Sequence, residues 1–248
     1  MRRQLHAEFL KLRSVRTTWL FLAVTAAVVA LAVIAQAVTA SGGDDLPPLS
    51  DPETQLMLFQ SASGLAPVIA VLLGTLGLAT EVRHHTLAST FLAEPRRTRV
   101  LAAKSVATFT LGAVLGLVAA ATAVTGSWLV LLATSNDVVA DTDRVLASVA
   151  GTMFAAALAA LLGLGIGGIV RNQAAAIGAA LIVMLAVEPL LGAFVPSFAA
   201  WLPSAIASRI AGAAPQADPG LVASAGLYGA YVAAALGAAA VVVRRADV

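Results

Sequence analysis

Ionisable side chains inside apolar segments are the first candidates for chemistry, and Glu188 stands out among them. It lies within a long apolar stretch, directly before Pro189. A carboxylate is costly in hydrocarbon, so such residues usually face the interior of a helix bundle, a partner or water. Glu188 could act as a gate, a polar contact or a proton-linked group. Alternatively, it accepts a structural hydrogen bond beside the proline, or it is exposed at the membrane interface.

The other residue types argue against metal binding and catalysis. The chain has no cysteine, and its histidines, His6, His84 and His85, are too few and too poorly spaced for a metal site. A catalyst inside a bilayer needs a nucleophile with a base, paired carboxylates or a metal. The histidines lie outside the apolar segments, and no two carboxylates share one such segment. We therefore expect no catalytic residue, no metal site and no enzyme activity in this chain.

Two patterns superficially suggest nucleotide binding. The Gly-Leu-Gly-Ile-Gly-Gly sequence at 163–168 lies within an apolar segment rather than after a soluble strand, so it predicts helix packing instead. A phosphate-binding loop requires Gly-x-x-x-x-Gly-Lys-Ser/Thr. Lys104 and Ser105 follow an alanine, and Thr98 stands where the first glycine belongs. If ATP is used, another chain must bind it.

The composition makes lipid the solvent for most of the chain. Hydrophobic residues form 60% of it, charged residues only 11%, and the mean hydropathy is +0.92. Charged residues make up about a quarter of a typical soluble domain. Long Ala, Val, Leu and Gly runs without strand-like alternation favour helices, which satisfy their own backbone groups in hydrocarbon. The predicted fold class is all-α, a polytopic membrane protein.

Six apolar segments reach the length of about 20 residues that a membrane span requires. They cover approximately residues 18–40, 57–80, 105–132, 146–170, 174–194 and 221–243. Because little length remains for a soluble domain, residues 1–248 are predicted to form a single transmembrane domain.

The basic residues orient these spans, because cytoplasmic loops retain Lys and Arg. Thirteen of the fifteen basic residues fall on one side, and only Arg144 and Arg209 lie opposite. This bias predicts a multi-pass protein of a bacterial inner membrane with both termini in the cytoplasm. The basic residues flank apolar segments, so we expect them to meet anionic membrane lipids and no nucleic acid.

The segment before the first span has one apolar face and one basic face. Its apolar residues Leu5, Phe9 and Leu12 lie on one side of a helical wheel, and basic residues occupy the rest. This predicts an amphipathic interfacial helix at the membrane surface. A charged flank that only orients the first span is a compatible alternative.

Glycines and prolines punctuate the later spans. Two G-x-x-x-G pairs, Gly112 with Gly116 and Gly163 with Gly167, predict close contacts between helices. Between the fifth and sixth spans, five prolines interrupt an apolar stretch. They predict short re-entrant half-helices in the outer leaflet, with a loosely ordered loop as the alternative. Pro189 and Pro203 therefore join Glu188 as gate or pathway candidates.

The segment from 81 to 104, between the second and third spans, has the sequence features that say most about function. Pro95 is a hinge, and Leu87, Phe91 and Leu92 form a compact amphipathic surface that suits a groove on a partner protein. A charged loop that only satisfies the orientation rule is the alternative.

This segment resembles the cytoplasmic loop of ABC-2 type transporter permeases. The residues that carry the resemblance are, in order, Glu81, Arg83, Thr86, Leu87, Pro95, Arg97 and Lys104. The Glu-Phe-Leu-Lys-Leu-Arg sequence at 8–13 and the Leu-Pro-Ser sequence at 202–204 resemble other parts of the same permeases. His85 departs from the pattern, because many relatives have glycine there.

The resemblance implies that residues from about Thr86 to Glu94 form a cytoplasmic coupling helix, which sits in a separate ATP-binding cassette ATPase. The implied coupling residues are Glu81, Arg83, Thr86, Leu87, Phe91, Leu92, Glu94, Pro95 and Arg97. Two ATPase copies and a second permease chain, identical or related, would complete the transporter. The permease would bind no cofactor itself, because ATP and Mg²⁺ would bind to the ATPase.

The resemblance further implies export of a hydrophobic or amphipathic substrate, such as a lipid, peptide, drug or lipid-linked glycan. Two other classes stay open. A secondary transporter driven by an ion gradient usually has several ionisable residues in its spans, and only Glu188 qualifies here. A non-transporting membrane anchor or sensor subunit for an ATPase is also compatible with the sequence.

Overall fold

The computed structural model describes residues 2–41, 48–83, 97–170, 172–213 and 220–244. Every regular element in these ranges is a helix, which confirms the predicted all-α fold. Six segments are long and apolar enough to cross a membrane: Arg16–Ser41, Pro52–Thr80, Thr98–Ala133, Thr142–Val170, Gln173–Phe194 and Leu221–Val243. The number and order of these segments agree with the prediction.

The second and third spans differ most from the prediction, because they begin at residues 52 and 98, five and seven residues earlier than the sequence suggested. The second consists of α3 (Pro52–Phe59) and α4 (Ala62–Arg83), and α3 starts where the Asp51 carboxylate accepts a hydrogen bond from the Thr54 N–H at 2.8 Å. The third is the single helix α6 (Arg97–Ala133). Its first two turns are charged, so an apolar-length criterion omits them although the helix continues.

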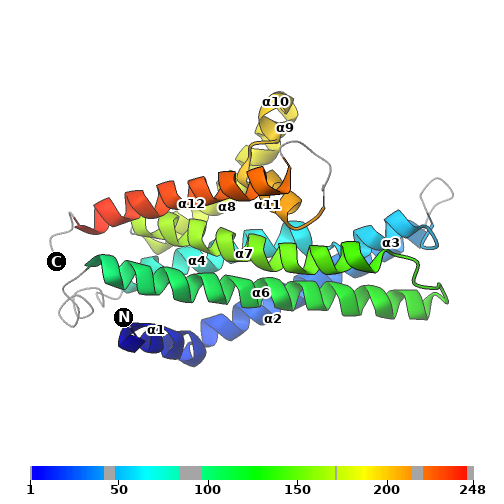
Figure 1. The fold of residues 1–248 in the computed structure, drawn as a ribbon, viewed down its shortest axis with the longest axis horizontal. Helices are drawn as coiled ribbons and strands as arrows, with labels where there is room; N and C mark the ends of the chain where they lie inside the picture. The colour runs from blue at the N-terminus through cyan, green and yellow to red at the C-terminus, as the bar shows by residue number, and fades with distance from the viewer. Residues whose placement is uncertain (1, 42–47, 84–96, 171, 214–219, 245–248) are drawn as a thin grey trace.

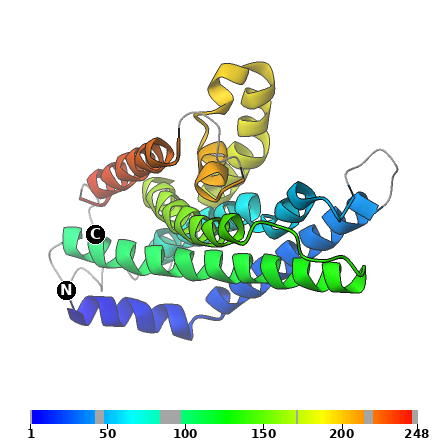
Figure 2. The same ribbon diagram turned by 45° about the vertical axis from the view of Figure 1, so that its right-hand side comes forward.

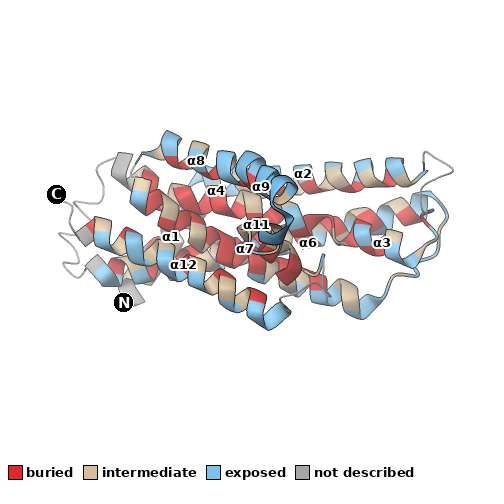
Figure 3. Cartoon of the chain, turned by 90° about the horizontal axis from the view of Figure 1, so that it is seen from above, coloured by how far each residue is buried: buried red, intermediate tan, exposed pale blue. Residues whose placement is uncertain are grey.

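Helix α7 (Thr142–Val170) is the centre of the bundle. It packs against α4, α6 and α12 (Leu221–Arg244), and α2 (Arg16–Ser41) packs on the far side of α6. Buried residues gather along α4 and α7 (Figure 3). The first, fifth and sixth spans are mostly exposed on the isolated chain. The core is therefore built from the second, third and fourth spans.

Glycines let α7 approach α4 at backbone distance. A Cβ atom added to Gly163 or Gly167 would overlap the carbonyl oxygen of Val71 or Thr75, respectively. The other two glycines of this segment, Gly165 and Gly168, instead face α12. Such close approach increases van der Waals contact between helices that gain little from the hydrophobic effect in lipid.

The second predicted glycine pair meets α7 from α6. A Cβ atom on Gly112 would lie 2.7 Å from the Ala156 carbonyl oxygen, and one on Gly116 would lie 2.7 Å from the Cα atom of Met153. Helix α7 therefore has small-residue contacts with three neighbouring helices.

The fifth span and the chain that follows it form a series of short helices. Helix α8 (Gln173–Ile182) continues through a π-helical turn, η1 (Val183–Val187), into α9 (Glu188–Phe194). Then follow α10 (Pro196–Ala199) and α11 (Pro203–Ile210). Helices α9 and α10 project from the bundle, and α11 returns to it (Figures 1 and 2). Pro196 and Pro203 are the first residues of α10 and α11, where the missing N–H costs nothing. Pro189 instead follows the π-helical turn within a continuous helical stretch.

The contact between α4 and α7 predicts a specific sensitivity. We expect Gly163→Ala to destabilise the protein by about 1–3 kcal/mol, because the added methyl group overpacks the contact with Val71. Thermal unfolding of the purified protein in detergent measures this change. Gly178→Ala in α8 is the matched control, because a Cβ atom there meets open space. Equal unfolding temperatures for the two variants would contradict the assignment.

Candidate functional site

The predicted coupling segment is flanked by two long helices. Thr86, Leu87, Phe91, Leu92, Glu94 and Pro95 lie outside the described residues, as does His85. Glu81 and Arg83 belong to the last turn of α4, and Arg97 is the first residue of α6. Both flanking ends lie at the same end of the bundle as helix α1 (Arg2–Ser14) and the end of α12 (Figure 1).

Helix α1 packs on the first part of α6 through a buried ion pair. The Glu8 carboxylate accepts a hydrogen bond from Nζ of Lys104 at 3.0 Å and another from Nζ of Lys11 at 2.9 Å. The Glu8 and Lys104 side chains are only 11% and 5% exposed. Leu5 and Phe9 of the predicted apolar face are half-buried beside this pair, and the Leu12 side chain lies outside the described part.

The two lysines control the ionisation of Glu8. Burial alone would raise the pKa of its carboxyl group, but the charge of Lys104 and the hydrogen bonds from both lysines lower the pKa below its ordinary value. The carboxylate is therefore charged at neutral pH. Its stabilising contribution is present above the ordinary carboxyl pKa and is lost as the pH falls through the lowered value.

Glu188 is buried at the start of α9, with 4% of its surface exposed. Its Oε2 accepts a hydrogen bond from the Ser204 N–H at 2.9 Å. Since Pro203 has no N–H, Ser204 provides the first backbone donor of α11, and a carboxylate is favourable at a helix N-terminus. This contact supports the structural alternative for Glu188. A role as a gate or pathway residue stays a prediction for Glu188, Pro189 and Pro203.

Two further side chains hold the turn before α11. Nη2 of Arg209 donates a hydrogen bond to the Ala200 carbonyl oxygen at 2.6 Å, and the Tyr231 hydroxyl donates one to the Trp201 carbonyl oxygen at 2.9 Å. Arg209 is buried. Sequence reasoning counted Arg209 only as a basic residue of the outer side, because nothing in its local sequence indicates a partner.

At the end of the bundle opposite α1, the Gln55 side chain holds several backbone segments together by hydrogen bonds. Its fully buried amide donates to the carbonyl oxygens of Leu49 and Asp137 at 3.0 and 2.8 Å. Its Oε1 accepts from the N–H groups of Val139 and Ala140 at 2.8 and 3.1 Å. One side chain therefore fastens the connection between α6 and α7 to helix α3. In the sequence Gln55 only follows the mostly polar residues 51–54 and precedes a short apolar run, and nothing there indicates a partner, so this role was missed.

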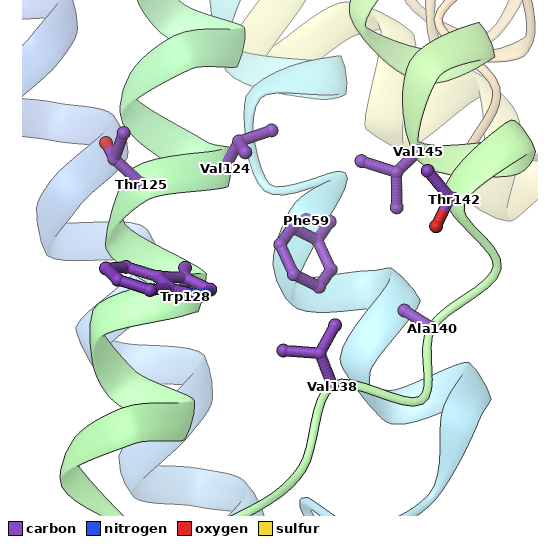
Figure 4. A pocket seen from close by; sticks show the side chains of 8 residues that line it. All are labelled: Phe59, Val124, Thr125, Trp128, Val138, Ala140, Thr142 and Val145. Carbon is purple, nitrogen blue, oxygen red and sulfur yellow. The ribbon is translucent and has the colours of Figure 1, made fainter.

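An apolar pocket lies beside this connection (Figure 4). It has a volume of about 340 Å³, and its lining residues are Phe59, Val124, Thr125, Trp128, Val138, Ala140, Thr142 and Val145. None of these side chains is ionisable. The pocket therefore suits an apolar group rather than a charged one. Among the described residues, no group of His, Cys, Asp and Glu side chains could hold a metal ion.

The hydrogen bonds of Gln55 predict a large effect of its removal. We expect Gln55→Leu to destabilise the protein by about 1–3 kcal/mol or more, because it leaves backbone donors and acceptors without partners. Thermal unfolding in detergent measures the loss. Gln60→Leu is the control, since Gln60 donates a single hydrogen bond, to the Gly212 carbonyl oxygen at 3.1 Å. A loss no larger than that of Gln60→Leu would refute the role of Gln55.

The six apolar spans and the helical bundle define a multi-pass membrane protein. The chain belongs to the ABC-2 family of transporter proteins, because the model of that family matches residues 4–206, most of its length. Comparison with curated proteins gives no match. The family assignment confirms the resemblance noted from the sequence and makes the chain a permease, the membrane component of an ABC transporter.

Proposed function

We propose that this permease exports a hydrophobic or amphipathic substrate across a bacterial inner membrane, using ATP that a separate subunit hydrolyses. The family match over residues 4–206 carries this proposal. The arrangement of α4, α6 and α1 supports it, because these helices bring both ends of the 84–96 segment to one face of the bundle. In this proposal that face is cytoplasmic.

The proposed partner is an ATP-binding cassette ATPase that receives the 84–96 segment in a groove. The permease sequence has no phosphate-binding loop, so ATP and Mg²⁺ would bind to the partner. Two ATPase copies and a second permease chain, the same or related, would form the complete transporter. The mostly exposed first, fifth and sixth spans offer apolar surface for this second chain or for lipid.

The packing of the core suggests how movement would pass through the bundle. A displacement at 84–96 acts on the ends of α4 and α6, and both helices contact α7 through glycines at backbone distance. Close-packed contacts of this kind transmit displacement instead of absorbing it. The short helices α9 to α11 at the other side of the membrane would then border the exit.

Attachment of the ATPase tests the proposal directly. We expect Phe91→Asp to reduce co-purification of the ATPase in mild detergent, because a charge would enter an apolar groove. Pro95→Ala should also weaken attachment, since it removes the hinge. Phe198→Asp is the matched control, because Phe198 is exposed on α10, outside the six spans and far along the chain from this segment. Unchanged co-purification with both loop variants would contradict the coupling role.

The capping role and the transport role of Glu188 predict different effects of two substitutions. Glu188→Gln keeps an oxygen acceptor for the Ser204 N–H, whereas Glu188→Leu removes it. If capping is its role, we expect Gln to transport normally across a range of pH and Leu to lose about 0.5–2 kcal/mol of stability. Flux in reconstituted vesicles and thermal unfolding measure the two quantities. Loss of transport in a stable Glu188→Gln protein would instead assign the charge to the transport cycle.

A further inference from the structure

The ion pair between Glu8 and Lys104 lies where movement from the ATPase would enter the permease. Lys104 is seven residues after the first residue of α6, or about 10 Å along the helix. The 84–96 segment directly precedes α6 in the chain. Glu8 is on α1, and 96 residues separate it from Lys104. The pair therefore joins two parts of the chain at the cytoplasmic end of the third span.

The contacts of α1 show that this pair sets its position. Helix α1 packs more extensively on α6 than on α2, although only Val15 separates α1 from α2 in sequence. Figures 1 and 2 both show α1 alongside the first part of α6. Among the apolar side chains of α1 that the structure describes, Leu5 and Phe9 are half-buried and Leu10 is exposed.

Apolar contacts alone would let α1 slide along α6, because they have no directional preference. The ion pair is directional, and separating it would leave a charge in a nearly dry site. Lys104 is 5% exposed and therefore has little water to replace the carboxylate. Lys11 is half-exposed and on the same helix as Glu8, so its ion pair with the Glu8 carboxylate lies within α1.

We infer that the Glu8–Lys104 pair is the joint that makes α1 move together with α6 when the ATPase acts. Glu8 is in this view a positioning residue that acts through α6. The inference rests on the proposed function. The first span would move with α1 and α6, because α2 itself packs on α6, follows α1 after one residue and is tied to α1 where the Trp19 indole N–H donates to the Arg13 carbonyl oxygen at 3.2 Å. Movement of α6 would thus displace α1 and α2 as one unit.

Charge variants of the pair provide the first test, in vesicles that contain the permease and its ATPase. We expect Glu8→Gln and Lys104→Gln to keep the ATPase bound and to reduce transport about fivefold or more. The charge exchange, Glu8→Lys with Lys104→Glu, should restore much of this loss when Lys11→Gln is made with it, because Lys11 would otherwise repel the lysine introduced at position 8. Glu53→Gln is the matched control, because its ion pair with Arg144 is exposed and lies at the other end of the bundle.

A distance measurement separates a loss of coupling from a loss of folding. The chain has no cysteine, so spin labels can be attached at Leu10→Cys and Ala102→Cys, two exposed positions on α1 and α6. We expect one narrow distance that does not change between nucleotide states, and a broader distribution after Glu8→Gln. A distance that changes with nucleotide in the otherwise unaltered protein would overturn the inference.

The experiments distinguish failure of the proposed function from failure of the Glu8–Lys104 joint. If no ATPase co-purifies with the unaltered permease, the proposed function fails. If the ATPase binds and drives transport, but Glu8→Gln and Lys104→Gln transport like Glu53→Gln, only the joint is refuted. Failure of the charge exchange to restore transport, in a folded protein with bound ATPase, would also refute it.

Discussion

Close backbone contact around α7 is the interaction on which the rest of this bundle depends. Helices in a bilayer gain little by covering one another's apolar side chains, because lipid tails are equally apolar, so they associate where small residues permit dense packing. Glycines at 163 and 167 meet α4, those at 165 and 168 meet α12, and those at 112 and 116 bring α6 against α7. The second, third and fourth spans form one packed core, and the remaining spans lie around it.

Polar side chains complete the structure at both ends, where helices stop and backbone groups lose their partners. Gln55 serves the connection between α6 and α7, and Glu188 with Arg209 serves the turns around α11. At the other end, Glu8 and Lys104 fasten α1 to α6. Each buried polar group costs free energy unless it is paired, so each fixes one arrangement of the segments that it joins.

The glycine contacts and the buried polar contacts have different roles in the proposed mechanism. The glycine contacts keep the core helices together, so a displacement of α4 or α6 reaches α7. In the proposed joint, the ion pair adds α1 to the parts that move. On the other side, α9 and α10 have large exposed apolar side chains and contact chiefly each other, which suits a region that changes shape, whereas α11 packs on α7, α12 and α4.

The sequence by itself determined the all-helical class, the six spans, the breaks at prolines and the glycine pairs that pack. Each of these follows from a local property: hydropathy over about 20 residues, a missing N–H or a small side chain at helical spacing. Only the tertiary structure decided that Glu8 meets Lys104, that Gln55 meets residues 137–140 and that Glu188 meets Ser204. The first two pairings join residues more than 80 positions apart, and the third crosses several breaks, so helix packing brings the partners together and no local pattern identifies them.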